Sequence, residues 1–204
     1  MKRKRRSFTN RNGNPPSPPQ ERLQLLARTV RENGFLASKV QYLKTPYMTR
    51  EGSVSDLART VSFLPNLLYV DLPDGSYSDD PFYGVLKHEL QSRCPRIRHM
   101  KYNAGSEGSF QMLAQSSQWR GLEILELSNL AVEPNTIIGV FVSLKALCEV
   151  KLANLPLLDD SIFAPTSSVD WSLPPLTVLN LQDVPSVSAR GLVAYLSQPG
   201  KPLF

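Results

Sequence analysis

A spaced pattern of apolar residues recurs along most of this chain and constrains its fold more than any other feature. Within each copy the apolar residues stand at positions 1, 4, 7 and 9, except that the first copy is degenerate, with Ala37, Val40 and Leu43 but no apolar residue at position 9. The copies begin at residues 37, 64, 94, 119, 144 and 173, so successive starts are 27, 30, 25, 25 and 29 residues apart. Chance does not hold such a spacing over most of a chain of 204 residues, so we interpret the sequence as that of a repeat protein.

Each copy predicts one short strand followed by one helix. In the last copy, Leu179 and Leu181 alternate as in a strand with one buried face, and Leu192 and Leu196 have helical spacing. Such a unit cannot bury its own apolar face, so the copies must stack on one another. A further helix, carrying Leu23, Leu26 and Val30 on one face, is expected to end at Asn33-Gly34. The helical residues after the other strands are Leu57 and Val61; Phe82, Leu86 and Leu90; Phe110 and Leu113; Ile137, Ile138 and Phe141.

The period and the apolar core resemble the cysteine-containing, F-box type of leucine-rich repeat. Leu179, Leu181, Gly191 and Leu192 match that family's L-x-L-x-x-C-x-x-I-T-D-x-G-L unit, with Val184 in place of the cysteine. The resemblance covers about residues 20–198. It implies an α/β solenoid that is right-handed, with about six irregular repeats, parallel strands on the concave face and helices outside.

Basic charge is concentrated at the N-terminus. The formal net charge is +5, but residues 1–20 hold six Lys and Arg and no acid, so the remainder carries 17 basic against 18 acidic side chains. Residues 1–19 are expected to be a disordered tail, followed by the repeat domain at 20–198 and a C-terminal tail at 199–204. Within the first tail, a cluster resembles a nuclear import signal, the alternative being a solvated basic tail. The cluster is Lys2, Arg3, Lys4, Arg5 and Arg6.

No pattern in the sequence is typical of a catalytic, metal or cofactor site. His88 and His99 have no partner at metal-ligand spacing, and Cys94 and Cys148 are too few for a zinc site or a disulfide framework. No glycine-rich phosphate loop occurs. We therefore expect a binding protein rather than an enzyme, with no cofactor and no metal.

Two pairs of neighbouring acids are better explained as structural than as catalytic. Asp80 precedes Pro81, which is typical of a helix N-cap followed by proline in the first turn. Asp159-Asp160 lies where the repeat family tolerates aspartate at its strand-to-helix turn. Because no apolar run is long enough to span a membrane and only two cysteines occur, we expect an intracellular protein, cytoplasmic or nuclear.

The repeat register predicts which side chains face the concave surface. Side chains alternate along a strand, so the residues between the buried positions point to the opposite face. Exposed aromatics amid mixed charge are typical of protein interfaces, and an equal number of acidic and basic residues argues against nucleic acid. The alternative is that these are ordinary solvated strand residues and the partner binds elsewhere. The predicted set is Tyr42, Lys44, Tyr69, Asp71, His99, Lys101, Ile124, Glu126, Glu149, Lys151, Val178 and Asn180.

The expected function is protein recognition. The resemblance to fungal F-box and leucine-rich-repeat receptors implies the substrate-binding part of a cullin-type ubiquitin ligase, whose partners would be a substrate protein, the F-box adaptor and the cullin complex. Such receptors carry an F-box of about forty residues; residues 20–34 are too short for one, so we expect a lost F-box or a truncated chain. The alternatives are a scaffold or regulatory protein without ligase function, which could act in the nucleus, and a nucleic-acid binder acting through Lys2–Arg6.

Overall fold

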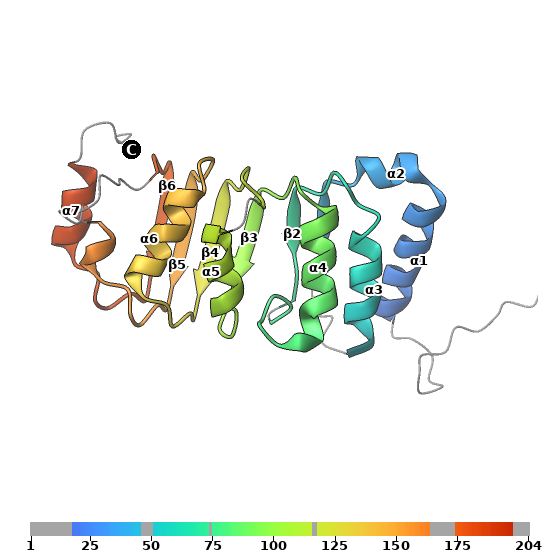
Figure 1. Cartoon of the computed structure of the whole chain (residues 1–204), viewed down its shortest axis with the longest axis horizontal. Helices are drawn as coiled ribbons and strands as arrows, with labels where there is room; N and C mark the ends of the chain where they lie inside the picture. Colours follow the sequence, from blue (N-terminus) through green and yellow to red (C-terminus); the bar gives the residue numbers. More distant parts are fainter. Residues whose placement is uncertain (1–17, 46–50, 74, 116–117, 164–173, 198–204) are drawn as a thin grey trace, which may run out of the picture.

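The computed structural model describes residues 18–45, 51–73, 75–115, 118–163 and 174–197, in which helices and strands alternate along the chain (Figure 1). The helices are α1 (Pro18–Glu32), α2 (Gly34–Lys39), α3 (Glu51–Val61), α4 (Gly84–Arg93), α5 (Glu107–Gln115), α6 (Pro134–Ser143) and α7 (Ala189–Leu196), with short 3-10 turns η1 (Pro81–Tyr83) and η2 (Asp160–Ile162). The strands are β1 (Tyr42–Lys44), β2 (Tyr69–Asp71), β3 (His99–Tyr102), β4 (Ile124–Ser128), β5 (Glu149–Ala153) and β6 (Val178–Gln182).

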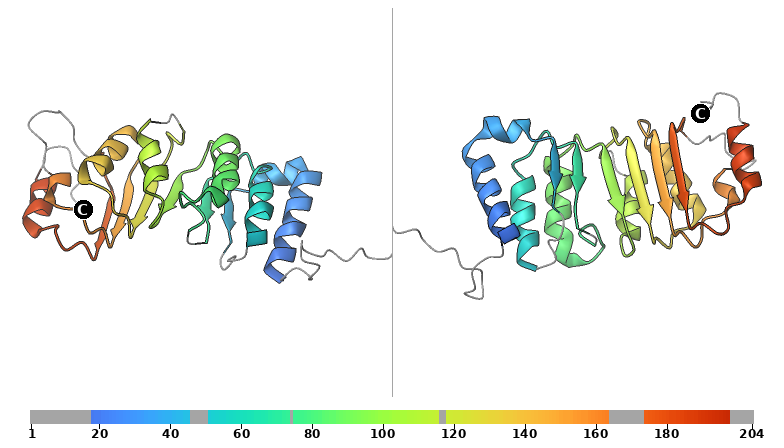
Figure 2. Two further views of the ribbon diagram at one scale, coloured as in Figure 1. Left: turned by 60° about the horizontal axis from the view of Figure 1, so that its bottom comes forward. Right: turned by 180° about the vertical axis from the view of Figure 1, so that it is seen from behind.

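The strands form one six-stranded parallel sheet in chain order, from β1 to β6. Helices α3 to α6 cover one face of this sheet (Figure 1). The opposite face, which we call the open face, shows strands without helices over them in the right panel of Figure 2. Parallel neighbours need a crossover connection, and α4, α5 and α6 supply it on the same side each time. The prediction of an α/β fold with parallel strands is confirmed.

The apolar residues of the repeat pattern form the core between the sheet and the helices. In the copy that begins at Trp119, Leu122, Leu125 and Leu127 are at most 1 % exposed. The last copy departs from this pattern, since Leu179 and Leu181 are only half-buried. Strand β6 is the edge of the sheet, so no further layer among the described residues covers these two side chains. Leu72 is likewise half-buried, and Leu173 lies outside the described residues.

The helices occur where the pattern predicts them, with one addition at the N-terminal end. Helix α1 ends at Glu32, as the Asn33-Gly34 pair predicts, but α2 begins at once because the Asn33 side chain accepts a hydrogen bond from the Leu36 amide at 3.1 Å. Ala37, the first residue of the degenerate copy, is buried within α2 rather than leading directly into a strand. Helix α1 begins at Pro18. Residues 1–17 lie outside the described residues, so the disordered tail stays a prediction.

The pairing of strands is at its shortest between β2 and β3. Only Tyr69 and His99 are in register there, whereas β4 and β5 pair over five residues. Pro73, two residues after β2, has no amide to donate to a ladder. The chain then turns inward and buries Tyr77, whose ring lies 5.3 Å from that of Tyr102, edge to face. This inward turn also accounts for the longest spacing between copies, 30 residues.

The phenol of Tyr102 generates a prediction about stability. This side chain is fully buried, and its hydroxyl has no hydrogen-bond partner among the described residues. A buried hydroxyl without a partner costs roughly 1–3 kcal/mol. Tyr102→Phe should therefore leave the free energy of unfolding in urea unchanged or raise it by up to that amount. Tyr102→Ala, the control, should lower it by about 3–5 kcal/mol. A loss of more than about 1 kcal/mol in Tyr102→Phe would contradict the assignment.

Candidate functional site

The strand register gathers the predicted binding residues into two rows that cross the open face. Strand partners share a row, because parallel neighbours in register point their side chains to the same side. The first row is Tyr42, Tyr69, His99, Ile124, Glu149 and Val178. The second row is Lys44, Asp71, Lys101, Glu126, Lys151 and Asn180.

Most of the second row is a chain of ion pairs with alternating sign, which we call the charge ladder: Lys44, Asp71, Lys101, Glu126 and Lys151. Asp71 lies 2.8 Å from Lys44 and 3.3 Å from Lys101. Glu126 lies 3.7 Å from Lys101 and 3.0 Å from Lys151. Each carboxylate thus bridges two ammonium groups from neighbouring strands. The sequence contains the alternating acidic and basic residues, but which of them form ion pairs becomes clear only when the strands lie side by side in the sheet.

Glu126 is the most strongly stabilised anion of this surface. In addition to the two lysines, Nε2 of His99 lies 3.2 Å from its Oε1 atom. Contact with His99 and a hydrogen bond from Lys151, together with the charge of Lys101, lower the pKa of Glu126 to about 2, against the opposing effect of burial. Hydrogen bonds to Glu126 and Glu149 in turn raise the pKa of Lys151. These contacts favour the charged forms of both Glu126 and Lys151.

Three aromatic rings begin the first row, and we call them the aromatic row: Tyr42, Tyr69 and His99. The ring centroids of Tyr42 and Tyr69 are 6.4 Å apart, and those of Tyr69 and His99 are 6.5 Å apart. Tyr42 is 56 % exposed, and the next two rings are half-buried. The aromatic row and the charge ladder run side by side across β1, β2 and β3, so apolar ring faces lie next to neutralised charges.

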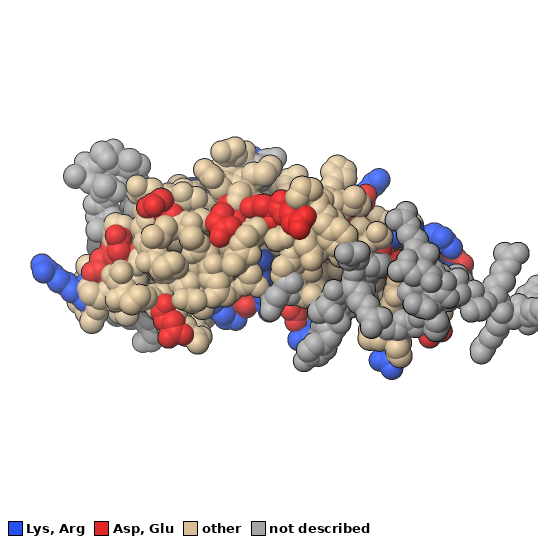
Figure 3. All heavy atoms as spheres, turned by 90° about the horizontal axis from the view of Figure 1, so that it is seen from below, with Lys and Arg blue, Asp and Glu red and all other residues tan. Residues whose placement is uncertain are grey.

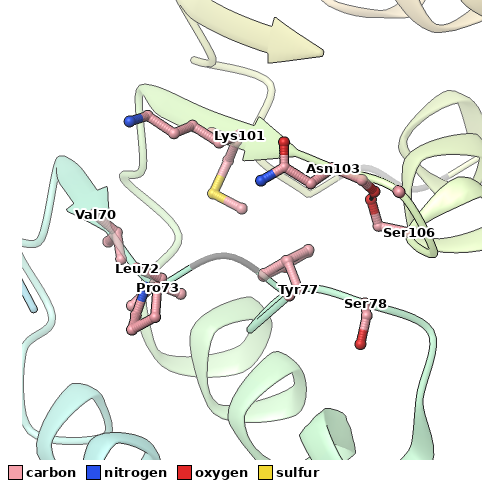
Figure 4. A pocket seen from close by; sticks show the side chains of 11 residues that line it. Val70, Leu72, Pro73, Tyr77, Ser78, Lys101, Asn103 and Ser106 are labelled. Atoms are coloured by element: carbon pink, nitrogen blue, oxygen red, sulfur yellow. Dashed lines mark hydrogen bonds between the residues drawn. The ribbon is translucent and has the colours of Figure 1, made fainter. Parts of the chain in front are cut away.

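A small cavity lies where the pairing of β2 and β3 has ended (Figure 4). The residues that follow Tyr69 and His99 in their strands, Val70 and Met100, line it together with Lys101 and Pro73. Its volume is about 30 Å³. A single water occupies at least about 10–15 Å³ on this measure, so the cavity admits one or two waters or a methyl group and excludes a cofactor.

The two pairs of neighbouring acids, Asp79-Asp80 and Asp159-Asp160, lie at the edge of the sheet where the helices begin. Figure 3 shows this edge from below, with acidic side chains gathered on it. Asp80 accepts a hydrogen bond from the Phe82 amide at 2.8 Å, as an N-cap. Asp79 accepts from the amides of Gly108 and Ser109, at 2.7 and 2.9 Å, and so caps helix α5 of the next unit. Asp160 accepts from the amide of Ser188, the residue that caps α7. The cap role of Asp80 follows from the sequence, whereas the hydrogen bonds of Asp79 and Asp160 to the segments beyond the next strand do not.

The other singled-out residues have structural surroundings. Cys94 is buried, and burial raises the pKa of its thiol to about 12, far from a reactive thiolate. His88 is exposed on α4. Among the described residues no group of three His, Cys, Asp or Glu side chains could hold a metal ion, and no helix is long and apolar enough to cross a membrane. The basic cluster Lys2–Arg6 lies outside the described residues.

The low pKa of Glu126 predicts a pH dependence of stability. A carboxyl whose pKa is lower in the folded chain stabilises it above the unfolded value near 4.5, and this contribution is lost as the pH falls toward about 2. In urea unfolding, the wild-type chain should exceed Glu126→Gln in stability near neutral pH, and the difference should shrink between about pH 4.5 and 2. A difference that stays constant over this range would show that the contacts of Glu126 are not formed in solution.

The cap formed by Asp79 predicts a loss of stability on its removal. Asp79→Ala leaves two amides of α5 without their acceptor, and loss of such a cap costs about 1–2 kcal/mol. Asp80→Ala serves as the matched control, because it removes only the cap of the short turn η1. Chemical denaturation should show the larger loss for Asp79→Ala. Equal losses in the two variants would contradict a role of Asp79 in joining neighbouring units.

Comparisons with known proteins supply no family for this chain. No family model matches it, and a search of curated proteins finds no significant match. The function proposed below is therefore supported by the rows of the open face, by the contacts within them and by the resemblance of the repeat pattern.

Proposed function

We propose that this chain recognises another protein through the open face of its sheet, and that it is a recognition module rather than an enzyme. The observation that carries the proposal is the aromatic row lying beside the charge ladder. Tyrosine is enriched at the energetic centres of protein interfaces, where its ring supplies contact area at low entropic cost. Tyr69, His99 and Glu126 lie at the middle of the two rows and would form the centre of the contact.

The proposal includes a leucine-rich-repeat solenoid of about six units as the scaffold. In its support, the turn after the strand is the same in three successive units. Asn129, Asn154 and Asp183 follow β4, β5 and β6 with φ of 56°, 49° and 50°. Asn and Asp are the residues other than glycine that adopt this left-handed conformation most readily. Units with the same strand, the same turn and the same spacing are what a stacked repeat requires.

Within this class, we propose the substrate-binding part of an F-box-type ubiquitin ligase receptor. The support is the resemblance of the repeats to that family, given by Leu179, Leu181, Gly191 and Leu192. The alternative is a scaffold or regulatory protein that uses the same face without a ligase. A nucleic-acid site is less well supported, because the ladder pairs its lysines with carboxylates rather than leaving an excess of positive charge.

The triple variant Tyr69→Ala/His99→Ala/Glu126→Ala tests the recognition face. Tagged wild-type and variant chains are expressed in fungal cells, and bound proteins are quantified by mass spectrometry after cross-linking. We expect at least one partner of the wild-type chain to fall about tenfold or more with the triple variant, as for the loss of hot-spot residues. The control is Phe82→Ala/Val85→Ala/Met112→Ala, which removes exposed apolar side chains from η1, α4 and α5. Recovery of every partner by the triple variant would contradict the proposal.

The ligase role has its own readout in the same experiment. An F-box adaptor that co-purifies with both the wild-type chain and the triple variant would support the ligase role, because it would bind away from the open face. Since residues 20–34 are too short for an F-box, a face-dependent partner recovered without the adaptor is the result expected of this chain by itself, and it would support recognition without ligase assembly.

A further inference from the structure

We infer that the partner of the open face presents an extended, uncharged segment in β conformation that lies along the aromatic row, across the strands, with apolar side chains at every second position. This inference rests on the proposed function and specifies the chemistry of the partner. It follows from the spacing of the rings and from the charges beside them.

The spacing of the rings fits an extended chain. Alternate side chains of a β-strand lie on one face and are about 6.6–6.8 Å apart. The centroid separations of 6.4 and 6.5 Å in the aromatic row are close to this value. Residues i, i+2 and i+4 of such a strand can therefore each contact one of Tyr42, Tyr69 and His99. A polyproline helix repeats a face only every third residue, about 9 Å apart, and an α-helix presents neighbouring side chains at a shorter step of about 5–6 Å.

The charges beside the rings favour an uncharged segment. A partner cation over Tyr69 would approach Asp71, but Asp71 already lies 2.8 Å from Lys44 and 3.3 Å from Lys101. A partner anion would approach Lys101, whose neighbours are the carboxylates of Asp71 and Glu126. Either charge would therefore meet groups of its own sign beside the group that attracts it, and would gain little net attraction. A neutral segment leaves the ladder intact, and its backbone carbonyls can accept hydrogen bonds from tyrosine hydroxyls.

A random peptide library tests this inference. A phage-displayed library of roughly twelve-residue peptides is selected on the immobilised full chain, and enriched peptides are measured by fluorescence anisotropy. We expect enriched sequences with apolar residues at i, i+2 and i+4 and no charge between them. Their affinity should fall about tenfold or more with Tyr69→Ala, should be largely kept with Tyr69→Phe, and should be unchanged with Phe82→Ala, which removes an exposed ring from η1. The thermal melts of all three variants are recorded to show that they fold.

Three outcomes would overturn the inference: enriched peptides with charged residues at the contact positions, peptides with helical spacing, or no enrichment. If no peptide is selected but a protein partner is still lost with the Tyr69/His99/Glu126 triple variant, the extended-segment inference fails and the proposed function stands. Peptides that bind Tyr69→Ala as tightly as the wild-type chain would show binding away from the open face. If, in addition, the triple variant recovers every partner, both the extended-segment inference and the proposed function are contradicted.

Discussion

The register between neighbouring parallel strands determines which side chains meet on both faces of the sheet. Side chains alternate along a strand, so a slip of one residue would exchange the buried and the exposed set. Leu125, Val150 and Leu179 share one row toward the helices, while Glu126, Lys151 and Asn180 share the next row on the open face. The apolar core and the charge ladder are therefore two consequences of the same register. The burial of leucine rows holds the ladder in place, since exposed ion pairs alone contribute little free energy.

Contacts between neighbouring units reinforce this register at the end of the strands. The Asn129 amide donates to the Ala153 carbonyl, and the Asn154 amide donates to the Gln182 carbonyl, which extends the ladder beyond β4 and β5. Asp79 and Asp160 then each cap the segment that follows the next strand. At the N-terminal end, Gln24 of α1 donates to Asp56 of α3 at 2.9 Å. The contacts between elements join neighbours such as α3 with α4 and β4 with β5, so the fold depends on links of this kind.

The sequence predicts the architecture well because the features concerned are periodic. The spacing of residues such as Leu122 and Leu125 fixes the strands, and the alternation places Ile124 and Glu126 on the opposite face. The structure departs from the sequence predictions where a single local contact determines the conformation of the chain. Helix α2 exists because Asn33 caps it, and the pairing of β2 and β3 ends early near Pro73 while Tyr77 fills the core. The distances within the ladder depend on twist and rotamers, which no pattern of residue types contains.

The same neutralisation that makes the ladder stable also determines what kind of recognition it can support. Paired charges give a weak field at long range, so they do little to steer a partner toward the surface. The paired charges act when a partner binds. A charged group of the partner that is placed on the row loses its hydration, and it gains no unpaired charge of opposite sign in exchange. Selectivity on this face would then come from excluding charged segments and from the fit of side chains to the rings of Tyr42 and Tyr69. Since Tyr42 is largely exposed and His99 is held against Glu126, the adaptable end of the row is at β1 and the rigid end is at β3.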